Sequence, residues 1–267
     1  MTVVVVGRNS LLAQAVARQS QTSDWLFLDH VEALEKPLPP DTSCVINFAF
    51  DPAGLQTAYQ PNHDFDRILA ERVAGKCSRF IMCSSRKVYS GTAAFGATET
   101  TPCSGADTYG INKAITERAL TDLLGDAATI LRIGNVVGFD GNWHRPVFMS
   151  QLLSSLKHRG KIIYDVGPST RRDFITDDAV ARAMIEIVRR DLQGIYNLGS
   201  GVALPIGQLA AWVMEGYGDG KLVITSPDVK DEFVLNVSRL QSILGPLCSV
   251  EEIQSKCLEL GRDIADA

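Results

Sequence analysis

Blocks of apolar positions along the chain predict strands and helices in turn. Thr2 to Val6 is a continuous apolar, β-branched run, which is typical of a strand buried on both faces of a parallel sheet. Residues 62–76 instead place apolar side chains at helical spacing and predict an amphipathic helix. The remaining pattern predicts strands at 25–29, 44–50, 79–83, 128–133, 161–164 and 194–199. It also predicts one helix that follows the first turn and ends near residue 19, and further helices at 108–124, 146–157 and 205–216.

This alternation predicts an α/β fold with a Rossmann-like doubly wound parallel sheet. Prolines at 37, 39 and 40 interrupt the second crossover, so any helix there is brief. The pattern changes after residue 138. We therefore expect residues 1–138 to form a dinucleotide-binding domain to which 172–200 returns, and 139–171 with 201–267 to form a small, interleaved C-terminal substrate-binding lobe.

Composition and charge exclude several classes of function. The chain has 267 residues, enough for a large core, and a net charge of -5, so no basic field attracts nucleic acid or an anionic membrane. No apolar run approaches a membrane span, and the N-terminus lacks the basic region of a signal peptide. The six cysteines show no C-x-x-C spacing. We expect a cytoplasmic protein with reduced cysteines and no metal site, and a homodimer is compatible with the sequence.

The candidate chemistry centres on Tyr109 and Lys113, which lie four residues apart on a predicted helix and so project from one face. A phenol with a pKa of about 10 is a poor base at pH 7, but a neighbouring cation favours its ionised form. Ser84 and Ser85 follow a predicted buried strand, at the edge where ligands bind in open α/β sheets. Because Y-x-x-x-K also arises by chance in helices, the interpretation of Tyr109 as catalytic depends on the neighbouring motifs.

The turn after the first strand is the place for a glycine-rich dinucleotide fingerprint. Only Gly7 of that motif is present, and the small residues Ser10 and Ala13 replace the other glycines, so an ordinary βα turn is the alternative. Asp29 ends the second predicted strand, where a carboxylate can accept hydrogen bonds from the adenine ribose and favour NAD. Arg8 argues for NADP, because a guanidinium in this turn can bind a 2'-phosphate, unless it is simply a solvated turn residue.

Three motifs in order carry a resemblance to a known family: S-S-x-x-V-Y at 84–89, E-T-x-P at 99–102 and Y-G-x-x-K at 109–113. Together they resemble the extended short-chain dehydrogenase/reductase family, the NAD-dependent epimerases, dehydratases and reductases of nucleotide sugars. The resemblance implies hydride transfer between nicotinamide and a sugar carbon. In it Tyr109 moves the hydroxyl proton, Ser85 orients the oxygen, and Lys113 holds the nicotinamide ribose and tunes Tyr109.

The same resemblance implies further cofactor contacts. The segment V-I-N-F-A-F at 45–50 is similar to the family's V-I-H-x-A-A, which places Phe48 and Ala49 along the cofactor, and Leu11 joins them from the first turn. Asn62 matches a family asparagine that steadies neighbouring strands, so we expect it to be structural.

Substrate contacts are implied in the second half of the chain. The segment L-R-x-x-N-V at 131–136 resembles a family turn in which Asn135 faces the substrate. The segment R-D-F at 172–174 resembles one in which Arg172 meets the diphosphate, the alternative being a salt bridge to Asp173 or Asp177. His144, in a loop, is either a substrate contact or a surface group.

These residues predict an NAD(P)-dependent oxidoreductase or epimerase that acts on a sugar, and the family resemblance implies that the sugar is nucleotide-linked. The 4,6-dehydratases of the family carry an acid pair directly after the catalytic hydroxyl residue, whereas Arg86 and Lys87 stand here. Epimerisation and ketoreduction therefore remain. The competing interpretation is a non-catalytic dinucleotide-binding redox sensor or complex subunit, against which the intact Ser85, Tyr109 and Lys113 argue.

Overall fold

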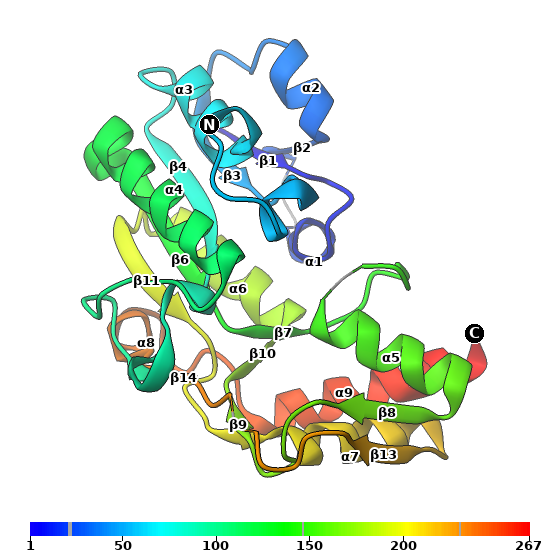
Figure 1. The fold of residues 1–267 in the computed structure, drawn as a ribbon. Helices are drawn as coiled ribbons and strands as arrows, with labels where there is room; N and C mark the ends of the chain where they lie inside the picture. The colour runs from blue at the N-terminus through cyan, green and yellow to red at the C-terminus, as the bar shows by residue number, and fades with distance from the viewer. Residues whose placement is uncertain (21–22, 146, 230) are drawn as a thin grey trace.

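A parallel sheet forms the centre of the molecule (Figure 1). The structure is a computed structural model that describes residues 1–20, 23–145, 147–229 and 231–267. In these ranges the main sheet has six strands, every neighbouring pair of which is parallel, and this confirms the predicted α/β, Rossmann-like fold. Its order is β11 (Gly194–Leu198), β6 (Ala128–Ile133), β4 (Arg79–Ser85), β3 (Thr42–Asn47), β1 (Thr2–Val6) and β2 (Trp25–Leu28).

The apolar run of β1 is buried on both faces, as its sequence predicts. Val3 and Val5 pack into one hydrophobic core with α1 (Leu11–Gln19) and α6 (Asp177–Arg189). Val4 and Val6 pack into a second core with α2 (His30–Glu35), α3 (Phe65–Val73) and α4 (Thr108–Leu124) on the opposite face. Fully burying an aliphatic side chain contributes about 1.5–3 kcal/mol, so β1 is a rigid base for the turn that follows it.

The strand order reverses direction after the short second crossover. After β2 at the sheet edge, α2 spans only 6 residues, and the chain then crosses back to place β3 on the other side of β1. The winding direction of the sheet therefore changes between β1 and β3. Ligands of open α/β sheets bind outside the carboxyl ends of the strands at such a switch point.

Several predicted elements have the observed bounds, and others differ at their ends. The helix at 108–124 and the strands at 128–133 and 161–164 appear as predicted. The helix predicted at 62–76 is shorter: the 3-10 turn η2 (Pro61–His63) precedes it, and Asp64 caps its first turn by accepting from the Arg67 N–H at 3.2 Å. Asn62 lies exposed in η2, and no hydrogen bond joins it to a described strand, so its expected strand-steadying role was wrong.

The C-terminal half packs against one end of the sheet (Figure 1). Helices α7 (Ile206–Tyr217) and α9 (Val250–Asp266) pack together, and α5 (Phe148–Arg159) lies beside the parallel pair β8 (Lys161–Tyr164) and β13 (Lys221–Ile224). Short pairs connect this region to the sheet: β7 (Asn135–Val137) with β10 (Phe174–Thr176), β9 (Arg171–Arg172) with β12 (Leu204–Pro205), and β5 (Phe95–Ala97) with β14 (Val234–Leu235), which α8 (Ser238–Leu244) follows.

The predicted start of the helix at 146–157 lies outside the described residues, and the observed α5 begins at Phe148. The division into two interleaved lobes stays a prediction, although β11, from the segment expected to return, does lie in the main sheet. Among the described residues, no helix is both long and apolar enough to cross a bilayer.

Candidate active site

Ser85 and Tyr109 meet at the carboxyl end of β4. Ser85 ends this strand and caps the 3-10 turn η3 (Arg86–Val88), where its Oγ accepts from the Lys87 N–H at 3.2 Å. Tyr109 lies in the first turn of α4. A Cβ added at Gly110 would be only 2.0 Å from the Lys87 carbonyl oxygen, so this turn of α4 lies directly against η3. This close approach places the Ser85 hydroxyl near the Tyr109 phenol.

A buried polar network fixes α4 to the sheet beneath this pair. Glu117, one turn after Lys113, forms an ion pair of 2.6 Å with Arg132 of β6 and a hydrogen bond with the Ser84 hydroxyl of β4. The Glu117 and Arg132 side chains are each 5% exposed. A buried ion pair holds its register when its remaining polar atoms are also bonded, and Arg132 additionally donates to Tyr89 and to the Glu99 carbonyl. Tyr109 and Ser85 are therefore aligned by groups that lie outside their own motifs.

The Tyr109 phenol titrates above its ordinary range in this site. Burial raises its pKa, and the nearby Lys113 ammonium opposes that effect without cancelling it. The influence of Lys113 thus has the expected sign, but the net direction is upward from 10.0. Tyr109 is accordingly protonated at neutral pH when nothing else is bound.

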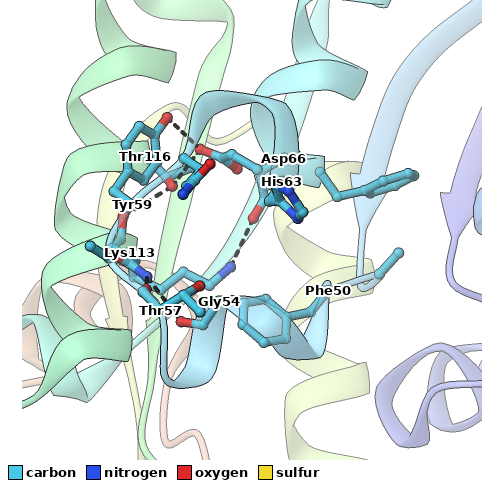
Figure 2. A pocket seen from close by; sticks show the side chains of 14 residues that line it. Phe50, Gly54, Thr57, Tyr59, His63, Asp66, Lys113 and Thr116 are labelled. Carbon is cyan, nitrogen blue, oxygen red and sulfur yellow. Dashed lines mark hydrogen bonds and ion pairs between the residues drawn. The ribbon is translucent and has the colours of Figure 1, made fainter.

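Lys113 is held by a carboxylate that the sequence motifs did not include. Its Nζ lies 2.8 Å from Asp66 Oδ2, and the two side chains are only 7% and 5% exposed. The second oxygen, Oδ1, accepts from Asn47 Nδ2 at 2.7 Å. Burial disfavours the ammonium, but Asp66 outweighs burial and raises the pKa of Lys113 above its ordinary value. Figure 2 shows the Lys113 amine directed at Asp66 along the wall of a small pocket.

Phe50 covers the same lysine from the side of the β3 exit. Its ring meets the Tyr109 ring edge-on, with centroids 5.3 Å apart at 89°, and its centroid is 5.3 Å from Lys113 Nζ. Sequence reasoning missed both Phe50 and Asp66. The signal for Asp66 was an acid on the face of α3 that also carries Leu69 and Val73, since a carboxylate among core positions needs a buried partner.

The β1 exit is a tight turn packed against the β3 exit. Gly7 adopts φ +91, and a Cβ there would be 2.8 Å from the Ala49 amide nitrogen and 2.9 Å from the Phe48 carbonyl carbon. Ser10 caps α1 by accepting from the Ala13 N–H at 3.2 Å, and Leu11 begins that helix. A glycine cradle beside a helix N-terminus fits a pyrophosphate, so the residues present are compatible with a dinucleotide cofactor.

Arg8 and Asp29 lie together at the far side of this turn. Arg8 forms ion pairs with Asp29 at 2.9 Å and Glu32 at 2.8 Å. Asp29 does not continue β2 but caps α2, where it accepts from the Glu32 N–H at 2.8 Å, and that bond together with Arg8 lowers the pKa of its carboxyl. The candidate groups for NAD and for NADP are therefore one cluster, in which two carboxylates hold the guanidinium.

The expected substrate residues are distributed more widely. Asn135 begins β7, and Arg172 in β9 pairs with Asp231 at 3.0 Å rather than with Asp173 or Asp177. Arg86 is buried over the Phe233 ring and reaches the same Asp231 at 3.6 Å. His144 is exposed in the loop after β7, and among the described residues no hydrogen bond or ion pair joins its side chain to Ser85, Tyr109 or Lys113.

Comparisons with known proteins agree with this arrangement of strands. The UDP-N-acetylglucosamine 4-epimerase from Methanobrevibacter ruminantium, solved with UDP-N-acetylmuramic acid, superposes with a TM-score of 0.81 at 17% identity, covering 100% of this chain and 99% of that one. MoeE5, solved with UDP-glucose and NAD, gives 0.78 at 20% identity, over 98% and 99% of the two chains.

A dTDP-4-dehydrorhamnose reductase from Clostridium acetobutylicum gives a TM-score of 0.78 at 16% identity and covers 100% of both chains. At these identities the likeness shows the fold alone. No curated protein sequence matches the chain. The model of the NAD dependent epimerase/dehydratase family, however, matches residues 3–199, well over half of the chain, and the protein therefore belongs to this family.

Proposed function

We propose that the protein is an NAD-dependent oxidoreductase or epimerase that acts on a nucleotide sugar, with Tyr109 as the acid/base. The observation that carries the proposal is the meeting of Ser85 and Tyr109 at the carboxyl end of β4, with Lys113 one helical turn further along α4. Similar folds bind NAD together with UDP-glucose, as MoeE5 does, which supports the cofactor and the substrate class.

In the proposed reaction, the bound dinucleotide supplies the nicotinamide that accepts or donates a hydride. Ser85 donates to the sugar oxygen and holds it beside the Tyr109 phenol. As a phenolate, Tyr109 takes up the hydroxyl proton, and as a phenol it returns a proton to the sugar oxygen; the Lys113 charge stabilises the phenolate form. Proton transfer by a positioned side chain contributes about 10²–10⁴-fold to such rates.

Gly7, Ser10, Leu11, Phe48 and Ala49, at the β1 and β3 exits, would hold the dinucleotide in this proposal. Asp29 would accept hydrogen bonds from the ribose hydroxyls, which favours NAD. The alternative is that Arg8 turns to a 2'-phosphate and selects NADP. Lys113, as in the family, also contributes to holding the nicotinamide ribose.

For the substrate, we propose that Arg172 binds the diphosphate and that Asn135 faces the sugar. Arg172 would leave its ion pair with Asp231 for this purpose, because a bidentate guanidinium–phosphate contact is stronger than an ion pair with an exposed carboxylate. His144 remains a candidate contact from its loop. The Arg86 and Lys87 side chains that stand in place of the dehydratase acids leave epimerisation or ketoreduction as the reaction.

A thermal-shift screen tests the proposal. Melting temperature is measured with NAD, NADH, NADP and NADPH, each with and without UDP-, dTDP- and GDP-sugars, because a ligand that binds only the folded protein raises it by mass action. We expect one dinucleotide to stabilise the protein and a nucleotide sugar to add to that shift. A dinucleotide shift without any sugar shift or turnover would favour the non-catalytic binding protein, and no dinucleotide shift would overturn the proposal.

A matched pair of variants tests whether the dinucleotide binds between the β1 and β3 exits. Gly7→Ala puts a methyl group against Ala49 and should abolish the dinucleotide shift. Gly75 also has a positive φ, of +71, but nothing lies within 4 Å of an added Cβ. Gly75→Ala carries a similar backbone strain and should keep the shift, so a loss in both variants would point to general destabilisation.

A further inference from the structure

A carboxylate faces the core from α3, next to the proposed active site. Asp66 shares its helical face with Leu69 and Val73, which are 0% and 1% exposed. Leaving a charge at such a position without a partner costs several kcal/mol, so its contacts define what the position does. Those contacts lead to Lys113 and not to solvent.

Asp66 is the middle of a chain of three side chains from three elements. Asn47, the last residue of β3, accepts the Ala49 N–H on its amide oxygen at 2.9 Å, and this orients its NH₂ group toward Asp66 Oδ1 at 2.7 Å. Asp66 Oδ2 accepts from Lys113 Nζ at 2.8 Å. Each carboxylate oxygen therefore has one donor, and the ammonium has one fixed position on α4.

Other titratable groups near Lys113 do not replace Asp66. Asp64 is already engaged, because its Oδ2 accepts from Tyr59 at 2.8 Å and from Thr116 at 2.7 Å while Oδ1 caps α3. Cys83 of β4 is a thiol whose pKa burial raises, so it stays neutral. His63 lines the pocket but pairs with Asp51 at 3.1 Å, and Tyr109 is the proposed acid/base itself. Among the described residues, Asp66 is the carboxylate in direct contact with the Lys113 ammonium.

We propose that Asp66 is a positioning residue of the active site, which fixes Lys113 and sets the pH at which the Lys113–Tyr109 pair releases its first proton. This inference rests on the proposed roles of Tyr109 and Lys113. With Asp66 ionised, loss of a proton from the pair leaves a net negative charge in a buried site. Without that carboxylate, the same loss leaves the site neutral and is easier, so Asp66 keeps the pair fully protonated to higher pH.

The test compares Asp66→Asn, which keeps the shape of the side chain, with Glu71→Gln on the same helix. Glu71 is exposed and pairs with Arg67 at 2.8 Å, so it controls for the loss of a helix charge. Magnetic resonance of isotope-labelled lysine and tyrosine side chains follows Lys113 and Tyr109 through an alkaline titration. We expect the first proton loss of the pair to move down by ~1 pH unit or more in Asp66→Asn, and to stay in place in Glu71→Gln.

This titration needs neither substrate nor dinucleotide, so its outcome is independent of whether the proposed function holds. Where turnover is measurable, the pH profile of Asp66→Asn should shift in the same direction. If Asp66→Asn does not fold, a titration of the wild-type protein still tests the proposal. With Asp66 in contact, Lys113 is expected to keep its proton above its ordinary pKa of 10.5. A Lys113 that titrates at or below that value, or an Asp66→Asn protein with a lower melting temperature but unchanged titrations, would overturn the proposal.

Discussion

Among single residues, side chains from separate sequence motifs lie together in the folded protein. Tyr109 is half-buried between the Ser85 hydroxyl, the Phe50 ring and Lys113, and burial moves its pKa upward more than the lysine moves it downward. A protonated phenol is the form that gives a proton to a sugar carbonyl. Taking a proton from a sugar hydroxyl instead requires the phenolate, which Lys113 stabilises. Asp66 sets the pH at which the Lys113–Tyr109 pair loses its first proton.

The Arg8–Asp29 cluster yields a prediction about cofactor choice. Asp29→Ala removes the carboxylate that would receive the ribose hydroxyls, so affinity for NAD should fall about tenfold or more, in the range of a charged hydrogen bond. Arg8→Ala should leave NAD affinity nearly unchanged. Titrations of both variants with NAD and NADP give the affinities, and a selective loss of NADP binding in Arg8→Ala would show that NADP is the cofactor.

At the scale of elements, the contact between α4 and η3 sets the active-site geometry. Gly110→Ala should force these elements apart, because its Cβ would lie 2.0 Å from the Lys87 oxygen. We expect a loss of stability of about 1–3 kcal/mol, as for overpacked sites, and a turnover loss of about 10²-fold from the displaced Tyr109. Denaturant unfolding and steady-state kinetics measure the two effects.

Gly125→Ala is the matched control for that variant. Gly125 ends the same helix with φ +55, and nothing lies within 4 Å of an added Cβ, so the substitution brings backbone strain without a clash. Its turnover should remain near that of the wild type. Equal turnover losses in the two variants would mean that helix stability, and not the α4–η3 contact, controls the site.

The cap of α4 gives a prediction about pH. Asp107 accepts from the Gly110 N–H at 2.9 Å and pairs with Lys87 at 2.6 Å, and although partial burial opposes them, these contacts lower the pKa of its carboxyl below 3.8. A lowered pKa contributes stability above pH 3.8 that is lost as pH falls through the folded-state value. Asp107→Asn keeps a capping side chain but should lose this pH dependence.

The effect should be small, about 0.2–1 kcal/mol, because the ion pair is well exposed. Unfolding free energies of the wild type and of Asp107→Asn, measured from neutral pH into the acid range, should converge below pH 3.8. A constant difference at every pH would show that the carboxylate charge has no part in capping this helix.

At the scale of the whole molecule, the sequence predicts strongly patterned elements best. The strand β1 follows from a continuous β-branched run. The helix α4, which buries polar residues such as Asn112 and Glu117, instead followed from its Y-x-x-x-K motif, and the order of the motifs led to the family. The strand order did not follow, because the residues of β3 carry no local signal that the strand pairs with β1 on the side opposite β2. The C-terminal helix α9 was not predicted, although its amphipathic pattern is clear in retrospect.

The site shows the same limit. Ser85, Tyr109 and Lys113 were recognisable from motifs, but Asp66 contacts Lys113 from 47 positions away, and only the packing of α3 on α4 brings the two together. The expected salt-bridge partners of Arg172, Asp173 and Asp177, were wrong. The observed partner, Asp231, lies far away in the sequence. Long-range pairs of this kind have no local signature.

Tyr109 is proposed to transfer the proton in a reaction of a nucleotide sugar. The most direct measurement is turnover of the nucleotide sugar and dinucleotide selected by the thermal-shift screen, compared between the wild type and Tyr109→Phe. The phenylalanine ring keeps the contact with Phe50 and loses only the hydroxyl. We expect turnover of Tyr109→Phe to be lower by ~10²-fold or more, with dinucleotide affinity unchanged. Wild-type turnover in Tyr109→Phe would contradict it, because the phenol would then not be the acid/base.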